Sequence, residues 1–555
     1  MSYHETIQSL SEDPEALETA YRQAVQDGAE ASFTEAVEAG YAGARDNLLL
    51  AAWHYRMALG GAAAKVKSRV VAWGWALPLG ALNGLLLWLL SDEQRFSIQV
   101  TNPLTGRAIT LMPAVALLAA PISAALIALF LTGAARPAGG TRARGGRRWG
   151  RLLAVVAGLA AGAAYVLLLF PRIWPRLFQE QYLSLMVLHL GLLSWAAVGI
   201  VALARHRAGA DTVRGDEENR FAFLVKSLEA FVVAGLLAIA GGLFTAITFG
   251  LFNALGIELP NAVQRLFVAG GAGLIAVVAV ALVYDPGAAP AEQAADEGLS
   301  KLVALLMRLL LPLAGGVLLV YVAFIPFNWR EPFESRDVLL IFNAMLFAVV
   351  ALLMGATPVH GAELGEKGQT WLRRGIIALA VLALLISLYA LAAILYRTAA
   401  DRITPNRLLF IGWDLVNIAI LAALLIQQAR SGRPGWLRAM HRTFAAGAVL
   451  YLAWSLAGLL ALPWLFRGDP ADAAGLPRLI QEIVYEHAEP ILLKCSTSPH
   501  VYRLQAGQKR WIRDIPTFEA EGYRWSDVQH IPCDDLRVVP DGETIPPGAG
   551  PPPQP

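Results

Sequence analysis

Six polar or ionisable side chains lie inside, or near the start of, long apolar runs of the sequence. They are Asp414, Asn417, Arg308, His189, Lys226 and Glu229. A charged group near the centre of a bilayer costs roughly 2.5–3.5 kcal/mol on insertion scales. Such a residue is therefore normally paired with another polar group or has a function. Asp414 and His189 carry groups that exchange protons, and Arg308 carries a fixed positive charge. Together they suggest a polar path for a proton, an ion or an amphipathic substrate.

A structural interpretation explains the same residues as buried pairs. Asp414 and Asn417 are three residues apart and share one helix face, and Arg308 is a second possible partner for Asp414. Lys226 and Glu229 are also three residues apart. A transporter would usually carry more polar groups in its spans. The sequence alone leaves both interpretations open.

The common catalytic and cofactor motifs are absent from the sequence. It contains no GxxxxGK[ST] phosphate loop, no GxGxxG, no HExxH and no GxSxG. Only His189 among the nine histidines lies well inside an apolar run, whereas a haem held by two histidines needs two axial ligands. Two cysteines are too few for an iron–sulfur cluster. We therefore expect no enzymatic activity, no cofactor and no metal site.

The composition indicates which elements must position these residues. Of the 555 residues, 56% are hydrophobic and 16% are charged, against about 25% charged in a soluble domain. This excludes a soluble enzyme, a disordered chain and a small disulfide-rich scaffold. It predicts an all-α integral membrane helix bundle with the lipid bilayer as its main partner. The formal net charge of +2 gives no argument for binding nucleic acid.

Eleven apolar runs are long enough to be candidate spans, because about 20 residues of helix cross a bilayer core. They lie at about 69–91, 111–133, 152–170, 182–204, 224–252, 263–284, 301–326, 338–355, 374–396, 407–427 and 443–465. Run 224–252 is long and interrupted by glycines, and run 338–355 is short. The polytopic domain is expected over 67–465.

Basic residues in the short loops predict the orientation. With the N-terminus inside, the inner loops carry 19 Arg and Lys residues and the outer loops carry 10, which agrees with the positive-inside rule. An odd number of spans then places the C-terminus outside. The high usage of Ala, Gly, Leu and Arg suggests a bacterial source. The expected location is the bacterial plasma membrane, with a cytoplasmic N-terminus and an external C-terminus.

The first 66 residues are polar and predict short helices in a cytoplasmic region, with a cytoplasmic protein as one possible partner. Asp13 precedes Pro14, which is the pattern of an N-cap followed by proline at N1. Ser32 and Glu35 have the spacing of a capping box. Asp46 is a candidate cap for a third helix that contains Trp53.

The C-terminal segment combines the two cysteines with several aromatic residues. A linker or amphipathic piece is expected over 466–494, a small α+β domain over 495–545 and a Pro-rich tail over 546–555. Because disulfides persist outside the cytoplasm, Cys495 and Cys533 are expected to pair, and free thiols are the alternative. Tyr502, Trp511, Tyr523 and Trp525 are candidates for binding a cell-envelope component. A domain this small also needs aromatic residues for its core.

Residues 501–533 predict the elements of that small domain. A hairpin is expected from 501–504 to 509–512 around a turn at Gly507. Asp514 is positioned to cap a short helix that ends at Gly522. An extended segment is expected from Val528 to Cys533.

Two stretches resemble known bacterial sequences. The turn Ile403-Thr404-Pro405-Asn406-Arg407, between two apolar runs, resembles a polytopic membrane family of unknown function, family four-one-five-three of the domains of unknown function. That resemblance implies an integral membrane protein and no assigned activity. The stretch from His500 to Val528 is similar to short repeats in envelope proteins of Chloroflexi-type bacteria, which implies an envelope-facing role.

Two functions follow from these observations. The first is a non-enzymatic, envelope-anchored sensory or scaffold protein that displays a small external binding domain. The second is a secondary transporter or a lipid or polymer exporter with a polar path near Asp414, Arg308 and His189.

Overall fold

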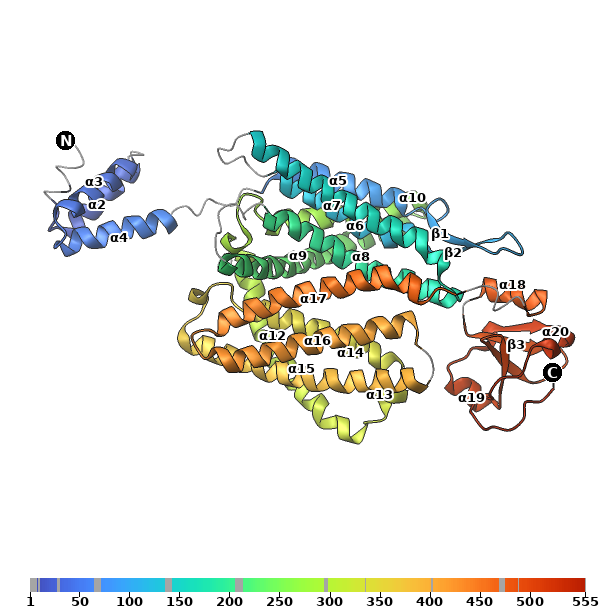
Figure 1. The fold of residues 1–555 in the computed structure, drawn as a ribbon. Helices are drawn as coiled ribbons and strands as arrows, with labels where there is room; N and C mark the ends of the chain where they lie inside the picture. Colours follow the sequence, from blue (N-terminus) through green and yellow to red (C-terminus); the bar gives the residue numbers. More distant parts are fainter. Residues whose placement is uncertain are drawn as a thin grey trace. The chain divides into compact units, whose positions relative to one another are not determined.

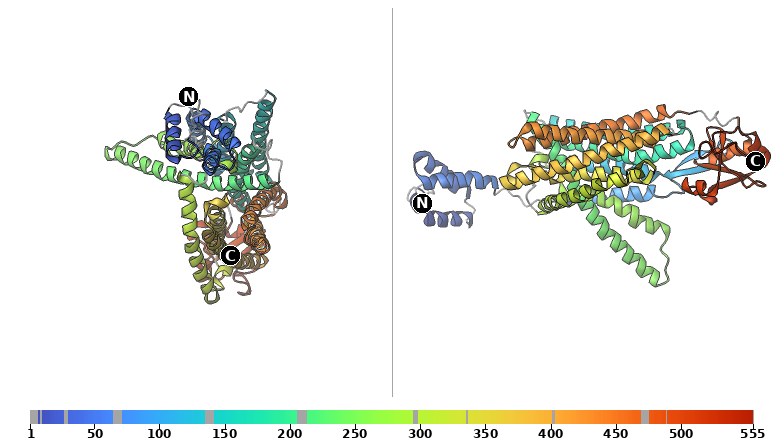
Figure 2. Two further views of the ribbon diagram at one scale, coloured as in Figure 1. Left: turned by 90° about the vertical axis from the view of Figure 1, so that its left-hand side faces the viewer. Right: turned by 90° about the horizontal axis from the view of Figure 1, so that it is seen from below.

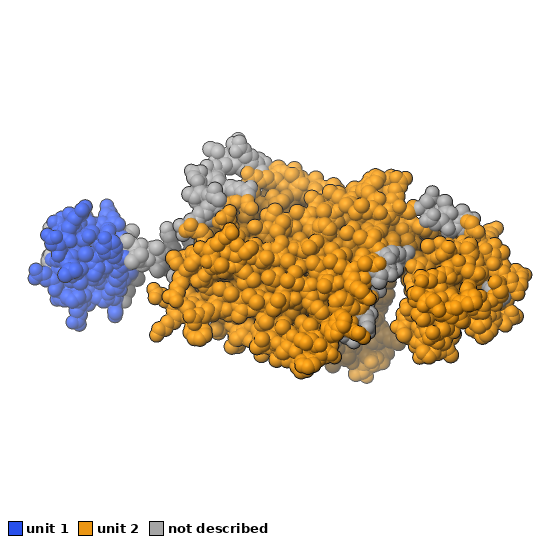
Figure 3. Space-filling view, turned by 60° about the horizontal axis from the view of Figure 1, so that its bottom comes forward, with its two compact units in different colours: residues 1–71 blue, residues 72–555 orange. Residues whose placement is uncertain are grey.

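A computed structural model describes residues 7, 10–26, 30–63, 71–134, 142–204, 213–293, 298–334, 336–400, 403–468, 475–487 and 489–554. The chain divides into two compact units, Met1–Val71 and Ala72–Pro555, which Figure 3 shows in different colours. Each unit has its own hydrophobic core.

The first unit consists of three helices, α2 (Pro14–Gln26), α3 (Glu30–Gly43) and α4 (Leu48–Ala63). They pack around Leu17, Phe33 and Trp53, which are at most 4% exposed. The Asp13 carboxylate accepts the backbone N–H groups of Glu15 and Ala16 at 3.1 Å, which confirms the predicted cap of α2.

The other two predicted caps of this unit are wrong. Ser32 lies inside α3, because that helix begins at Glu30. The third helix is capped by Asn47 instead of Asp46: the Asn47 Oδ1 accepts the N–H groups of Leu49 and Leu50 at 2.9 and 3.0 Å. Both residue types can cap a helix, so the sequence could not choose between neighbouring positions.

The second unit contains a bundle of long helices (Figure 1). They are α5 (Trp73–Leu90), α6 (Ala114–Gly133), α7 (Arg142–Leu169), α8 (Arg176–Ala204), α9 (Val213–Ala254), α10 (Asn261–Arg265) continued by η2 (Leu266–Gly270) and α11 (Gly271–Val283), α12 (Gly298–Phe324), α14 (Arg336–Ala356), α15 (Glu366–Ala400), α16 (Pro405–Ser431) and α17 (Trp436–Leu465). Within the described residues, ten helices are long and apolar enough to cross a membrane, with α10, η2 and α11 counted as one. These ten coincide with ten of the eleven expected spans.

The eleventh expected span, 338–355, falls in α14. The helix is 21 residues long, about 31 Å at 1.5 Å per residue, and it runs the full length of the bundle. It follows α13 (Glu331–Glu334), where Phe333 contacts Tyr396 near the end of α15, and it ends beside Glu363 near the start of α15.

One core of the bundle is built on α14, α15 and α16, a second core surrounds α8, and the most exposed long helices are α9 and α12. Leu346, Leu353 and Ile386 are fully buried in the first core. By contrast, only 11% of the apolar window of α9 and 17% of that of α12 are buried. Figure 2 shows α9, drawn in green, projecting away from the rest of the bundle.

Helices α5 and α11 approach each other closely through glycines. A Cβ atom on Gly84 would lie 2.6 Å from the backbone oxygen of Gly270, and one on Gly273 would lie 2.8 Å from the backbone nitrogen of Gly84. Gly158 and Gly162 on α7 have the i, i+4 spacing that permits close helix packing, but a Cβ on Gly158 would meet nothing within 4 Å, and one on Gly162 would meet only the Leu190 side chain at 3.7 Å. Close packing therefore uses only the first set.

A small α+β domain follows the bundle. Its strands β3 (Ile491–Cys495), β4 (Val501–Gln505), β5 (Gln508–Ile512) and β6 (Val528–Ile531) form a sheet in the order β5-β4-β3-β6, in which only the β3–β6 pair is parallel. The predicted hairpin is confirmed, with Tyr502 opposite Trp511 in the antiparallel β4–β5 pair. Its turn places Ala506 and Gly507 at φ of 50° and 74°.

Three further elements complete this domain: α18 (Arg478–Glu486), α19 (Ile515–Ala520) and α20 (Cys533–Val538). A disulfide joins Cys495 at the end of β3 to Cys533 at the start of α20. Ile480 of α18 is part of the domain core. The folded segment therefore begins before residue 495, because β3 and α18 supply apolar residues that the sheet needs.

The small domain contacts one end of the bundle, next to the hairpin of β1 (Ser97–Thr101) and β2 (Ala108–Pro113). Arg176 donates a hydrogen bond to the backbone oxygen of Glu486, and the Glu486 carboxylate lies 3.7 Å from the Arg107 guanidinium. Trp174 packs on Tyr485 with ring centroids 5.2 Å apart. We call this end of the bundle the hairpin end, and the opposite end, at residues 357–365, the loop end.

Candidate functional site: two polar clusters in the bundle

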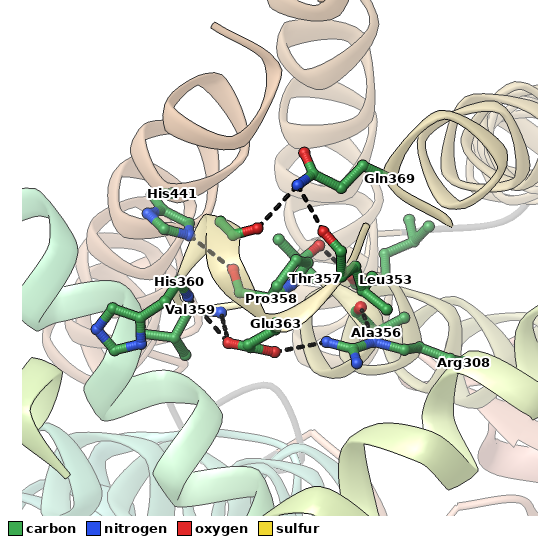
Figure 4. Close-up of polar contacts among 12 residues, drawn as sticks. Arg308, Leu353, Ala356, Thr357, Pro358, Val359, His360, Glu363, Gln369 and His441 are labelled. Atoms are coloured by element: carbon green, nitrogen blue, oxygen red, sulfur yellow. Dashed lines mark hydrogen bonds and ion pairs between the residues drawn. The ribbon is translucent and has the colours of Figure 1, made fainter. Parts of the chain in front are cut away.

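Glu363 is the hub of the first polar cluster, at the loop end. Its Oε1 accepts the backbone N–H groups of Val359 and His360 at 2.7 and 2.9 Å, and its Oε2 accepts Arg308 Nη2 at 2.7 Å (Figure 4). The Glu363 side chain is only 6% exposed. Three donors on one carboxylate fix the turn between α14 and α15 and neutralise the buried charge.

Arg308 connects this turn to α12 and to the end of α14. Its Nε donates to the backbone oxygen of Ala356, the last residue of α14, at 3.2 Å. The last carbonyl groups of a helix have no partner within the helix and carry partial negative charge. One guanidinium therefore binds both a carboxylate and a helix C-terminus.

Lys226 and Glu229 on α9 form a second buried ion pair. Lys226 Nζ lies 2.9 Å from Glu229 Oε2, and the side chains are 5% and 6% exposed. Ser300 on α12 bridges the pair: its Oγ accepts from Lys226 at 2.8 Å and donates to Glu229 at 3.0 Å. The bridge joins α9 to α12, two helices that make few other contacts.

The two ion pairs line one small cavity. Its volume is about 20 Å³, slightly more than the ~10–15 Å³ that a single water needs. The lining includes Lys226, Glu229, Arg308, Glu363, Ser300 and Thr357. We call this group of residues the ion-pair cluster. Each of its ionised groups is paired with a group of opposite charge, as expected of a structural element that holds α9, α12 and the loop together.

Neighbouring side chains hold the same loop from α15 and α17. His441 Nε2 donates to the Pro358 oxygen at 3.0 Å, because a carbonyl can only accept. Gln369 Nε2 donates to the oxygens of Gly361 and Leu364 at 2.8 and 2.9 Å (Figure 4).

The second polar cluster lies deeper in the bundle, around Asp414 on α16. Asp414 is 1% exposed and its Oδ1 has no hydrogen-bond partner among the described residues. Asn417, one turn later, accepts a hydrogen bond from the Tyr451 hydroxyl on α17, but its buried Nδ2 likewise has no partner in the described part of the chain. We call Asp414, Asn417 and Tyr451 the Asp414 cluster. It contains a buried acid to which no described residue supplies a neutralising cation.

His189 borders this cluster, but both of its ring nitrogens are already bonded. The Trp413 indole N–H donates to Nε2 at 3.3 Å, and Nδ1 lies 2.7 Å from the Leu185 oxygen. An indole N–H can only donate and a carbonyl can only accept, so the ring is a neutral tautomer with its proton on Nδ1. His189 thus acts as a spacer between α8 and α16 in this arrangement.

Asp414, Arg308 and His189 do not form one cluster. Arg308 pairs with Glu363, so the pairing of Asp414 with Arg308 considered from the sequence is absent, as is a direct Asp414–Asn417 hydrogen bond among the described contacts. His441, at the loop, and Tyr451, at the Asp414 cluster, are ten residues apart on α17. That separation corresponds to about 15 Å along the helix.

In the small domain, three of the four candidate aromatic residues belong to the core. Tyr502 is fully buried, and burial raises its pKa to about 12. Trp511 and Tyr523 pack against the two core clusters of the domain. Only Trp525 is exposed, at 52%, with its ring stacked on Phe518 at 4.4 Å.

Asp514 caps α19 as predicted. Its Oδ1 accepts the Thr517 backbone N–H at 2.9 Å and the Thr517 hydroxyl at 2.6 Å. These hydrogen bonds, with a smaller contribution from the neighbouring Arg513, lower the pKa of Asp514 to about 2. Gly522, at φ of 72°, follows the end of that helix as predicted.

Sequence reasoning did not select Glu363, Ser300 or Tyr451. Glu363 lies three residues after His360, the spacing of a capping box, and that was the one available signal. Ser300 and Tyr451 have no local signal, because their partners are 71 and 34 residues away. Among the described residues, no group of three or more His, Cys, Asp or Glu side chains is placed to hold a metal ion.

Comparison with known proteins yields no relative from which a role for these residues can be transferred: no family model, curated protein or solved structure matches the chain. The two sequence resemblances described above stay predictions.

Proposed function

We propose that this chain is a multi-pass integral membrane protein, of a bacterial plasma membrane, that displays its C-terminal domain on the outer face as a non-enzymatic sensory or scaffold protein. One observation supports the proposal that the C-terminal domain is displayed: residues of α18 make specific contacts that hold the domain against the bundle. Arg176, Arg107 and Trp174 all contact Glu486 or its neighbour Tyr485. Contacts of this kind favour a fixed orientation over a free tether.

The membrane location is supported by the outer faces of the helices. Phe231, Ile239, Leu309 and Phe327 are each more than two-thirds exposed. Large continuous apolar surfaces are rare on soluble monomers. Eleven crossings, with α14 included, put the two ends of the bundle sequence on opposite sides. The excess of basic residues in alternate loops supports a cytoplasmic N-terminus.

The orientation can be tested with the chain's own two cysteines, because both lie in the displayed domain. After mild reduction, a membrane-impermeant maleimide should label Cys495 and Cys533 in intact cells. A matched variant with Cys495→Ser, Cys533→Ser and Ser32→Cys should be labelled only after the cells are permeabilised. Labelling of the native cysteines only after permeabilisation would overturn the external location.

Binding by the displayed domain can be tested with isolated peptidoglycan sacculi as the probe. We expect full-length protein in detergent to sediment with sacculi and Trp525→Ala to reduce that binding. Trp371→Ala is the control, since Trp371 is also exposed but lies at the start of α15 in the bundle. Absence of binding by the full-length protein would remove the basis for a sensor of this material.

The unmatched acid supports a second candidate function, a secondary transporter or a lipid or polymer exporter. A buried carboxylate needs a proton or a cation to balance its charge, and coupling proteins use such groups. In proteoliposomes carrying a pH-sensitive dye, proton flux should disappear in Asp414→Ala. Flux in that variant equal to that of the wild type would exclude a relay at Asp414.

A further inference from the structure

An elongated apolar cavity lies between α8 and α17, with α9, α14 and α16 forming the rest of its wall. Its volume is about 470 Å³, within the ~300–1,000 Å³ typical of small-molecule sites. The walls are almost entirely hydrocarbon and include Leu192, Ile200, Phe347, Val350, Ala448 and Leu452. On α8 the lining extends from Leu192 to Ala204, about 18 Å of helix. The shape and lining suit a single hydrocarbon chain.

The cavity opens sideways, on the flank of the bundle. Ile200 of α8 and Val449 of α17 line it and are 57% and 52% exposed. In a membrane this flank faces lipid, so a ligand enters from the bilayer and not from water.

The deep end of the cavity is apolar even though two residues there carry polar atoms. The Trp413 indole N–H is directed to His189, and the Tyr451 hydroxyl is directed to Asn417. The ring surfaces of Trp413 and Tyr451 therefore close the cavity and separate it from the Asp414 cluster. The terminal methyl group of a bound hydrocarbon chain would therefore contact only the ring carbons of these two side chains, because their polar atoms are hydrogen-bonded elsewhere.

Among the described residues, the other end of the cavity carries more positive than negative charge. Arg220 lines it, and Arg151 of α7 donates to the backbone oxygen of Ala204, another lining residue, at 2.6 Å. Asp216 pairs with Arg220 at 2.5 Å. Arg151 has no carboxylate partner among the described residues, so the described part of this end holds two guanidinium groups and one carboxylate, Asp216, which pairs with Arg220. A phosphate would supply the missing negative charge.

We propose that this cavity binds one acyl chain of an anionic membrane phospholipid whose phosphate lies between Arg151 and Arg220. The proposal combines a chain-shaped apolar wall, access from the bilayer and a cationic mouth. It rests on the membrane location proposed above and is independent of whether the protein senses, displays or transports.

Native mass spectrometry of the full-length protein tests this proposal directly. Phosphatidylglycerol and phosphatidylcholine with identical chains serve as probes. We expect phosphatidylglycerol to remain bound at lower lipid concentration and to resist competition by inorganic phosphate. Equal retention of the two lipids, or displacement by phosphate alone, would overturn the proposal.

Matched variants locate the site. Ala448→Phe fills the cavity and should remove the tightly bound lipid, while Ala446→Phe, on the exposed face of the same helix, should leave it. Ala196→Phe is a second filling variant, from α8, should Ala448→Phe fail to fold. Lipid retained by both folded filling variants would show that the cavity is not the site.

Charge variants test the mouth. Arg151→Gln should weaken phosphatidylglycerol binding roughly fivefold, the effect of one basic residue near a membrane surface, and weaken phosphatidylcholine binding less, because the choline group already balances the charge of that lipid's phosphate. Arg442→Gln is the control, because Arg442 pairs with Glu217 and does not line the cavity. A separate alkaline carbonate extraction of membranes reports whether the protein is integral, so failure of lipid binding is distinguishable from failure of the membrane location.

Discussion

The ion-pair cluster and the Asp414 cluster bury the same kinds of groups with opposite outcomes. In the first, Glu363 accepts three hydrogen bonds and each ionised group has a partner of opposite charge. In the second, Asp414 has a buried oxygen without a partner and no cation beside it among the described contacts. The first cluster uses its charges to hold a loop and three helices, whereas the second carries an uncompensated polar group.

This difference shows that a charge in an apolar helix is not in itself a sign of function. Arg308 and Lys226 are explained completely by the contacts that they make. The contacts of Asp414 do not explain its burial. A buried group that lowers stability and makes no compensating contact is the better candidate for a role in binding or coupling. Substitutions in the two clusters should therefore have effects of very different size.

The largest loss of stability is expected for Glu363→Ala. It leaves the Arg308 guanidinium without its carboxylate and two backbone N–H groups without an acceptor, so we expect a loss of about 4–5 kcal/mol. SDS titration of the protein in detergent micelles measures it. Glu366→Ala, at an exposed position three residues later, should change stability little; equal effects of the two variants would contradict the role of Glu363 as a hub.

A loss of roughly 3–4 kcal/mol is expected for Lys226→Met, because Glu229 is left charged and buried. Ser300 remains as one hydrogen-bond donor to Glu229, which moderates the effect. The double variant Lys226→Met/Glu229→Met should recover most of the loss, since neither charge remains. A double variant as unstable as the single one would show that the pair has a role beyond neutralising charge.

Opening the disulfide should destabilise the small domain by about 2–4 kcal/mol, since 38 residues separate the two cysteines. Pulse proteolysis of the full-length protein, with Cys495→Ser/Cys533→Ser beside the wild type, measures this. The bundle should keep its own resistance to SDS. Loss of both together would show that the domain and the bundle unfold as one unit.

Asp414→Asn should change stability by less than about 1 kcal/mol, because the carboxyl group makes no hydrogen bond or ion pair with any described residue. Asn417→Ala is the comparison within the same cluster: it removes the hydrogen bond from Tyr451 and should cost about 1–2 kcal/mol. If Asp414→Asn proves more damaging than Asn417→Ala, the contrast between the two clusters fails.

The smallest effect is expected outside the bundle, at Asp514. Its pKa is lowered to about 2 in the folded domain, against about 3.9 for an unfolded chain. The stabilisation is therefore fully present above pH 4 and is lost as the pH falls through 2. Pulse proteolysis between pH 5 and pH 3 should show a shallower decline for Asp514→Asn than for the wild type; parallel curves would contradict the capping role.

The elements that were predictable from the sequence depend on local patterns. Apolar runs determine the helices, and turn and cap residues such as Gly507 and Asp514 determine the hairpin and α19. The start of the small domain at α18 was less visible, because Ile480 is recognisable as core only when the sheet is present. The predicted cap at Asp46 failed because the neighbouring Asn47 takes that position, and the one at Ser32 failed because α3 already begins at Glu30.

The polar clusters required long-range information. Lys226 and Glu229 meet within one helix turn, so their spacing was informative. Arg308 meets Glu363 across 55 residues, and Tyr451 meets Asn417 across 34. No periodicity encodes such distances. The sequence therefore identified residues that are costly to bury without indicating which of them are compensated.

The place of α14 in the chain has a consequence for how the protein is made. Its apolar run, from Val338 to Ala356, is about 28 Å long, close to the ~30 Å thickness of the hydrocarbon layer. Its buried face matches α15 and α16, which are synthesised later, so α14 makes its final contacts only once these helices have been synthesised. If α14 did not cross the bilayer, every later helix would be inserted in the opposite orientation. In the orientation proposed above, the two cysteines would then lie on the reducing side of the membrane, where their bond does not form.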